Sequence, residues 1–190
     1  TVMGDTIQKP GGDSGVVKVH GTTKAIAASV DSSAVYCWAH PLTGGKQVVC
    51  ESFRNLISVG AKPLAITNCL NFGNPENQEI MGEFAECLEG IKEACEFLDY
   101  PVVSGNVSFY NGTNKKNIFP TPVIGGVGLI QDIKKVVNHK FKEIGNEVLI
   151  VGKTFGHLEQ SAFFTEVHNN LEGAPPEVNL KNEKNNGNII

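Results

Sequence analysis

The most regular feature of the sequence is a helical pattern of apolar residues between Pro75 and Tyr100. The apolar positions are separated by four, four, three, four and three residues: Ile80, Phe84, Leu88, Ile91, Cys95 and Leu98. Glutamates occupy the other side of the pattern: Glu83, Glu86, Glu89 and Glu96. The spacing predicts a long amphipathic helix with one buried stripe. The acidic row is interpreted as its solvated side.

Strand-like segments precede and follow this helix. Alternating apolar residues predict two short strands within residues 15–31, joined by a turn at residues 21–23. Helical spacing returns between Gly44 and Gly60, and Gly60 is suited to end that helix. Further strands are expected at residues 62–72, 100–109 and 121–130. The order strand, strand, helix, strand, helix, strand, strand implies a sheet with helices packed on one face.

The sequence changes character after Gln131. Residues 131–147 are polar and basic, residues 148–154 predict a new strand, and residues 159–168 predict a short helix. We therefore expect a first domain over residues 1–131 and the beginning of a second domain over residues 138–190. About 50 residues are too few to close a core of their own. The chain is thus expected to be a fragment.

Composition excludes several classes of protein. With 41% hydrophobic and 19% charged residues, the chain is typical of a soluble globular protein. A net charge of −4 argues against a broad nucleic-acid-binding surface. No apolar run approaches the roughly 20 residues that span a bilayer, and the N-terminal residues lack a signal-peptide core. The five cysteines form no C-x-x-C pair, which argues against zinc or a disulfide framework and favours a cytoplasmic protein.

Glycine-rich and glycosylation-like motifs carry little weight here. Gly44-Gly45-Lys46 lacks the earlier Gly and the following Ser or Thr of a P-loop. The GGVG segment at residues 125–128 is not followed by the last Gly of a dinucleotide-binding motif. Two N-x-S/T sequons, at residues 106–108 and 111–113, are interpreted as chance matches.

Two polar loops follow expected strands and are better candidates for a site. In PVVSGNVSFYN, an extended backbone would place Asn106 and Ser108 on one face, while Gly105 leaves room for a ligand against the backbone. An amide oxygen suits a hard cation, and a hydroxyl can donate to a substrate oxygen. The alternative is a plain strand that leads into a turn at Asn111-Gly112.

The second polar loop, TNCLNFGNP at residues 67–75, also comes where a strand runs into a loop before a helix. Its asparagines are Asn68, Asn71 and Asn74. Ligands often bind at the carboxyl ends of strands in sheets of this kind, so two Asn-rich strand ends favour a binding site. A structural alternative exists for Asn74, which could cap the helix that begins near Pro75.

Between Pro10 and Gly187 the chain contains, in order, PGGDSGVVKVHGTTKA, GGKQVV, AITNCLNFGNPE, PVVSGNVSFYN, PTPVIGGVGLI and GAPPEVNLKNEKNNG. Together these segments resemble the large subunit of phosphoribosylformylglycinamidine synthase, in the aminoimidazole ribonucleotide synthetase superfamily. The resemblance implies an α+β fold, with the ferredoxin-like domain from the second half of that subunit. The beginning of an α/β domain would follow it. The resemblance also implies ATP and Mg2+ as cofactors and formylglycinamide ribonucleotide as substrate. ATP would phosphorylate the amide oxygen of this substrate, and ammonia would then displace the phosphate.

The same resemblance assigns roles to single residues. Asn68 and Gly105 correspond to ATP-binding positions, Asn106 to a magnesium ligand and Ser108 to a substrate contact. Asn68 stands where relatives often have Asp, so a charge is missing there. Asp13 and Asp31 match positions at which related proteins hold acidic nucleotide or metal groups, but neither is assigned to the site. The implied partners are the remainder of the synthase, its glutaminase subunit and its small bridging subunit.

No catalytic residue is assigned, because the catalytic histidines of the family belong to the half that would precede Thr1. The histidines of this chain stand in no matching motif: His20, His40, His139, His157 and His168. A rival interpretation is an assembly module whose sheet pairs with another such domain, without a ligand site. Another is a superfamily member acting on thiamine phosphate, selenide or a hydrogenase maturation substrate, but LNFGNPE and SGNVSFYN favour the purine enzyme.

Overall fold

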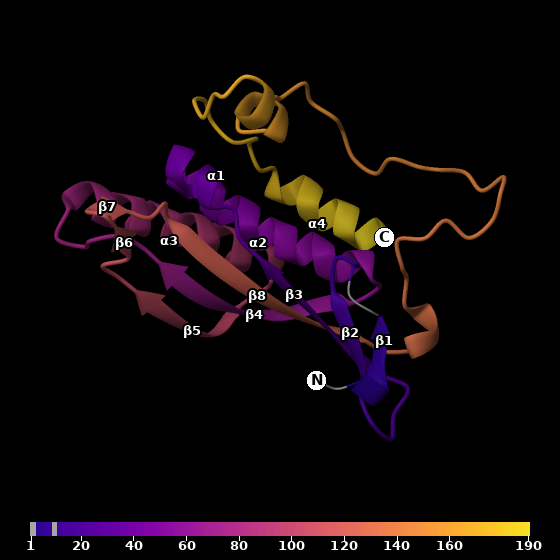
Figure 1. The fold of residues 1–190 in the computed structure, drawn as a ribbon. Helices are drawn as coiled ribbons and strands as arrows, with labels where there is room; N and C mark the ends of the chain where they lie inside the picture. Colours follow the sequence, from indigo (N-terminus) through magenta and orange to yellow (C-terminus); the bar gives the residue numbers. More distant parts are fainter. Residues whose placement is uncertain (1–2, 9–10) are drawn as a thin grey trace.

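The computed structural model describes residues 3–8 and 11–190 of the chain (Figure 1). Residues 1–2 and 9–10, which fall inside the first expected domain, lie outside the described residues. The sheet has the strand order β1-β2-β3-β8-β4-β5. Its strands are β1 (Thr6–Gln8), β2 (Gly15–Lys18), β3 (Ala25–Asp31), β8 (Thr121–Ile130), β4 (Lys62–Asn71) and β5 (Val102–Ser108). A separate small hairpin consists of β6 (Gly112–Thr113) and β7 (Lys116–Asn117).

Strand directions decide where the sheet can carry a site. β8 lies antiparallel between β3 and β4, and β5 runs parallel to β4 at the edge. β3, β4 and β5 therefore all point the same way, and their carboxyl ends meet at one end of the sheet. The chain reaches β4 and β5 through helices, as parallel strands require a long crossover.

Helices cover one face of this sheet and leave the other uncovered (Figure 1). The helices are α1 (Ala34–Ala39), α2 (Pro41–Ser58), α3 (Gln78–Leu98) and α4 (Leu180–Ile189), with short turns η1 (Met3–Asp5), η2 (Ile133–Lys135) and the π-helical η3 (Phe163–Val167). Burial alternates strictly along β3, where Ala25, Ala27 and Ser29 face the helices and Val30 is exposed. This alternation is what a half-covered sheet demands. The expected α+β, ferredoxin-like sheet with helices on one face is confirmed.

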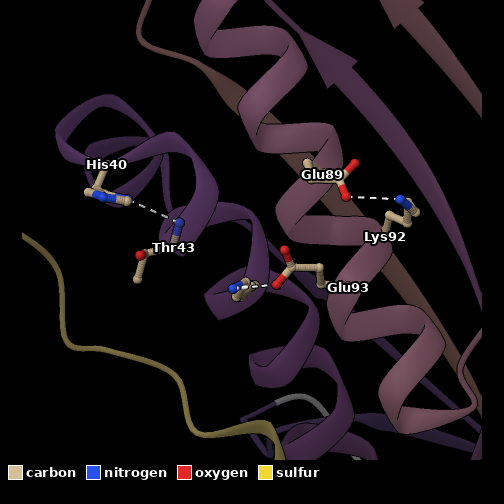
Figure 2. A network of polar contacts seen from close by, with 6 residues as sticks. His40, Thr43, Glu89, Lys92 and Glu93 are labelled. Carbon is tan, nitrogen blue, oxygen red and sulfur yellow. Dashed lines mark hydrogen bonds and ion pairs between the residues drawn. The ribbon is translucent and has the colours of Figure 1, made fainter.

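α2 and α3 lie side by side over the sheet, and glycines set their spacing. A Cβ on Gly90 of α3 would collide with the backbone oxygen of Leu42, and one on Gly45 of α2 would collide with that of Cys87. Lys46 of α2 forms an ion pair with Glu93 of α3, with 2.5 Å between the ammonium nitrogen and a carboxylate oxygen. Figure 2 shows the exposed Glu89–Lys92 pair on α3.

The ends of these helices differ in detail from the sequence-based expectation. α2 begins at Pro41, where the His40 ring accepts a hydrogen bond from the Thr43 amide (Figure 2). Gly60, at φ +85°, follows its last turn as expected. The cap of α3 is Asn77, which accepts from the Glu79 amide. The structural alternative for Asn74, a cap on this helix, is wrong, because its side chain closes a local turn with the Glu76 amide instead.

The C-terminal third departs furthest from expectation. Residues 148–154 form no strand; Val148, Leu149 and Ile150 are 72%, 78% and 84% exposed, because no neighbouring strand supplies a ladder for them. The helix expected at residues 159–168 is reduced to η3. α4 was not expected, since its sequence is polar; it packs on α2 and α3.

α4 is fastened to the first part of the chain by specific polar contacts. Glu183 lies 2.9 Å from the Arg54 guanidinium of α2, and Lys184 donates to the Phe97 carbonyl of α3 at 2.8 Å. Gly187 lets the helix approach the Phe53 ring closely. Among the described residues, no helix combines the length and apolarity needed to cross a membrane.

Candidate functional site

The two polar loops of the sequence meet at the carboxyl ends of β4 and β5. The parallel register pairs Asn68 with Gly105, Cys69 with Asn106 and Asn71 with Ser108. β5 is the edge strand, so its far side is unpaired within the described sheet. The expected gathering of both loops at one end of the sheet is therefore present.

The sheet separates the four assigned residues onto two faces. Leu70, which is buried, points toward the helices, so Cys69 and Asn71 point to the uncovered face. Their partners Asn106 and Ser108 share that uncovered face, in agreement with the expected alternation. Asn68 and Gly105 alternate with them and belong to the helix-covered face.

Gly105 has a neighbour that explains why it lacks a side chain. A Cβ at this position would collide with the side-chain oxygen of Asn68 and would lie 2.7 Å from the Asn68 backbone oxygen. The sequence had suggested room for a ligand at Gly105, and the structure shows that Asn68 itself occupies this room. Asn68 and Gly105 thus form one local unit across two strands.

Asn106 is the most available polar side chain of the group. It is exposed, and within the described part of the chain its side-chain amide has no hydrogen-bond partner. An amide oxygen that no protein donor occupies can serve as one ligand of a hard cation. Asn106 alone supplies one oxygen, so a complete cation site needs further ligands.

Ser108 is held in place by Asn111, a residue that the sequence indicated only as part of a turn. The Asn111 amide nitrogen lies 2.9 Å from the Ser108 carbonyl oxygen, 3.1 Å from its hydroxyl and 3.0 Å from the Phe72 carbonyl. Asn111 thereby ties the end of β4 to the end of β5. The Asn-Gly pair at residues 111–112 suggested only a turn, and no local pattern revealed the contact with Phe72.

Most of the remaining asparagines in the two loops have structural partners. Asn71 donates to the Thr121 carbonyl at 3.2 Å, and Asn117 accepts from the Asn74 amide at 3.0 Å. An aromatic cluster closes the loops against α3, where Phe84 contacts Phe72 and Phe109 with ring centroids 5.0 and 5.1 Å apart. The Asn-rich composition therefore reflects loop construction as well as binding capacity.

A second oxygen cluster lies at the carboxyl end of β3, on the helix-covered face. Asp31 accepts from the Asn55 amide at 2.6 Å, and its other carboxylate oxygen is buried without a partner among the described residues. Burial first, and then the charge of Asp31, raises the pKa of Glu51. Glu51 and Asn55 stand one turn apart on α2, a spacing that could have been noticed in the sequence. Asp13 is exposed in the loop before β2 and does not complete a metal cluster.

The histidines with described contacts have structural partners. His40 caps α2, His157 contacts the Ala174 carbonyl at 2.9 Å, and exposed His20 contacts Asp5 at 2.6 Å. All five cysteines are free thiols, and four of them are buried. Burial, as the main cause, raises the pKa of Cys50 to about 12 and that of Cys95 to about 11. Such thiols are packing groups rather than nucleophiles.

Comparison with known proteins identifies clear relatives. A family model described as AIR synthase related protein, N-terminal domain, matches residues 11–130. Phosphoribosylformylglycinamidine synthase subunit PurL of Pelagibacter ubique is 69% identical over 190 residues, covering 100% of this chain and 26% of that relative. PurL of Bradyrhizobium diazoefficiens is 53% identical over 189 residues, with the same coverage of 100% and 26%. The chain spans about a quarter of the length of these curated relatives.

Solved structures give the same picture. Thermotoga maritima PurL complexed with ATP is 36% identical, with a TM-score of 0.66 over 72% of this chain and 23% of that chain. PurLQS from Thermotoga maritima is also 36% identical, with a TM-score of 0.67 over 73% and 23%. AaThiL, at 21% identity and a TM-score of 0.55 over 76% of this chain and 41% of that chain, shares the fold.

Proposed function

The chain belongs to the AIR synthase related proteins, and we propose that it is one part of an ATP-dependent ligase of purine biosynthesis. The longer protein would convert formylglycinamide ribonucleotide and glutamine-derived ammonia to formylglycinamidine ribonucleotide in the cytoplasm. It would act with the remainder of the synthase, a glutaminase subunit and a small bridging subunit. PurL of Thermotoga maritima, whose structures include complexes with ATP and FGAR and the PurLQS assembly, supports this proposal.

One structural observation carries the proposal for this chain. Asn106 and Ser108 lie on the same uncovered face of an edge strand, at the carboxyl end of two parallel strands. An amide oxygen and a hydroxyl can therefore contact the same ligand from one side. This is the location where sheets of this type commonly bind small molecules.

Each residue has a separate proposed task. Asn106 would provide one oxygen to Mg2+, and Ser108 would donate a hydrogen bond to the substrate. Asn68 would contact ATP through its side-chain amide, which fills the side-chain space at Gly105, and Gly105 would contact ATP through its exposed backbone. Bound Mg2+ would neutralise phosphate charge during transfer of the phosphoryl group. The neutral Asn68 could act through hydrogen bonds only, since it has no charge with which to bind a cation.

The Asp31 cluster is a further place in this chain with oxygens suited to a cation. Asp31 has a buried carboxylate oxygen without a partner in the described part of the chain, and both Glu51 and Asn55 lie beside it. These groups fit Mg2+, which favours carboxylate and amide oxygens. We include them in the proposed magnesium chemistry of the longer protein, separately from Asn106.

The proposed function is tested in the longer protein with formylglycinamide ribonucleotide, ATP, Mg2+ and ammonia. Ser108→Ala should raise the KM for the ribonucleotide about tenfold, the value of one hydrogen bond to a charged group. Ser104→Ala is the matched control, because Ser104 lies four residues before Ser108 on the same face of β5 and is exposed. Absence of any formylglycinamidine ribonucleotide from the parent protein would overturn the proposal.

A second candidate function, assembly through the uncovered face, has its own observation. This face exposes Ile26, Val30 and Val127 by 45%, 76% and 41%. Apolar side chains gathered on one sheet face are suited to pairing with another domain or with a second copy of this chain. Val30→Asp should weaken such self-association in sedimentation measurements, whereas Ile144→Asp, at an exposed position outside the sheet, should not. Equal effects of the two substitutions would contradict pairing through the sheet.

A further inference from the structure

Asn111 contacts three acceptor atoms at the point where β4 and β5 end. Its amide nitrogen reaches the Phe72 carbonyl at 3.0 Å, the Ser108 carbonyl at 2.9 Å and the Ser108 hydroxyl at 3.1 Å. The Asn111 backbone amide also donates to the Phe72 carbonyl at 3.2 Å. The residue is half-buried, so solvent competes only partly for these bonds. Its side chain is therefore fixed relative to the Ser108 hydroxyl.

The Asn111–Ser108 pair has two possible hydrogen-bond arrangements, and they differ in whether the hydroxyl presents its hydrogen or only its lone pairs to a ligand. In one, the Asn111 nitrogen donates to the Ser108 oxygen at 3.1 Å, and the serine hydrogen is free to point outward. In the other, Ser108 donates to the Asn111 oxygen at 3.3 Å and offers only lone pairs to a ligand. The Asn111 amide has two hydrogens: one is donated to the Phe72 carbonyl, and the other is shared between the Ser108 carbonyl at 2.9 Å and the Ser108 hydroxyl at 3.1 Å. This shared contact is shorter than the alternative contact between the hydroxyl and the Asn111 oxygen. The geometry thus favours Ser108 as a donor toward solvent.

We propose that Asn111 is a positioning residue that turns the Ser108 hydroxyl into a hydrogen-bond donor, so that Ser108 selects an acceptor oxygen of its ligand. The acceptor would be a phosphate or a carbonyl-type oxygen rather than an N–H group. This inference rests on the proposed role of Ser108 in substrate binding. It goes beyond that role because it assigns the polarity of the contact and the residue that sets it.

Asn111→Asp reverses the polarity of the pair. The carboxylate has no hydrogen to donate and would accept the serine hydrogen, leaving only lone pairs toward the ligand. In the longer protein, Asn111→Asp should raise the KM for formylglycinamide ribonucleotide about tenfold, with a much smaller change in kcat. The matched control is Asn117→Asp, which adds the same charge to the same loop. Its carboxylate can still accept from the Asn74 amide, so KM should stay close to that of the parent.

A double-mutant cycle with Ser108→Ala separates positioning from a purely structural role. If Asn111 acts through the Ser108 hydroxyl, Asn111→Asp should have little further effect on KM in the Ser108→Ala background. Additive effects would overturn the inference. Asn111→Ala repeats the cycle in case the Asp variant unfolds, because it removes the donor without capturing the serine hydrogen. If Ser108→Ala itself leaves KM unchanged, the proposed substrate contact fails; if only the Asn111 variants leave it unchanged, this inference alone fails.

Discussion

At the scale of single residues, Asn106 combines exposure with an unoccupied amide oxygen. Asn106→Ala in the longer protein should therefore lower turnover about tenfold at limiting Mg2+, with partial recovery at high Mg2+. The free energy of unfolding should change by less than about 0.5 kcal/mol, since Asn106 is exposed and its side chain has no hydrogen-bond partner among the described residues. A magnesium titration of turnover checks this, with Ser104→Ala as the control on the same strand. An unchanged magnesium dependence would remove Asn106 from the metal site.

Glu51 gives a prediction for stability that depends on pH. Burial and the Asp31 charge raise its pKa above 4.5, while Arg54 acts in the opposite direction. Because the pKa of Glu51 is higher in the folded than in the unfolded protein, folding favours the protonated carboxyl. The stability that this provides is fully present below pH 4.5 and is lost as pH rises through the folded-state pKa. Glu51→Gln should thus stabilise the metal-free protein at pH 7 and should have no effect on its stability at pH 4. The gain at pH 7 should be about 1 kcal/mol or less, because Glu51 is half exposed and solvent screens its charge.

Urea unfolding at the two pH values measures this difference. Added Mg2+ extends the test, since a cation bound beside Asp31 should stabilise the parent more than the Gln variant. A stabilisation that is equal at pH 4 and pH 7 would show that the effect of Glu51 does not come from its charge.

At the scale of elements, the packing of α2 on α3 depends on Gly90. A Cβ there would meet the backbone around Leu42, including its carbonyl carbon at 2.9 Å, and a helix backbone cannot move aside cheaply. Gly90→Ala should destabilise the protein by about 2 kcal/mol, although alanine is the better helix former by about 1 kcal/mol. Gly82→Ala, on the same helix, should stabilise it slightly, because an added Cβ there would have no described atom of another residue within 4 Å. Thermal unfolding of the two variants should therefore shift in opposite directions, and a shift of both in the same direction would refute the close-packing argument.

The sequence predicted the long elements well because their signals are local. The helical spacing of apolar residues in α3 and the alternation of apolar residues along the strands match the observed burial, since one face of each element is buried. The strand predicted at residues 148–154 was wrong because a strand needs a neighbouring strand to form hydrogen bonds with. Apolar composition does not show whether that neighbouring strand is present. α4 was missed for the opposite reason: Glu183 and Lys184 stabilise it through contacts with distant parts of the chain, which a polar sequence does not reveal. At the site, alternation placed Asn106 and Ser108 together, but the Asn111–Phe72 contact joins two loops 39 positions apart.

At the scale of the whole molecule, the chain presents two incomplete surfaces. The uncovered sheet face is apolar over β3 and β8, and the end of β5 offers neutral oxygens and a hydroxyl but no carboxylate cluster. No group of three or more His, Cys, Asp or Glu suited to a metal is found in the described ranges 3–8 and 11–190. We expect other protein groups of the longer protein to complete both surfaces.

We therefore predict that this chain alone does not form formylglycinamidine ribonucleotide at a useful rate. Catalysis of phosphoryl transfer needs the nucleotide, the metal and the attacking group placed together, and each contributes several orders of magnitude only in that arrangement. In the proposed function, the chain would supply only Asn106 and Ser108 on one side of such a cleft, and His40 and His157 are engaged in structural contacts. The measurement compares the purified chain with a full-length PurL at equal concentration, with ATP, Mg2+, ammonia and formylglycinamide ribonucleotide. Turnover by the chain within tenfold of the full-length protein would contradict the division of the site, whereas ribonucleotide binding without turnover would support it.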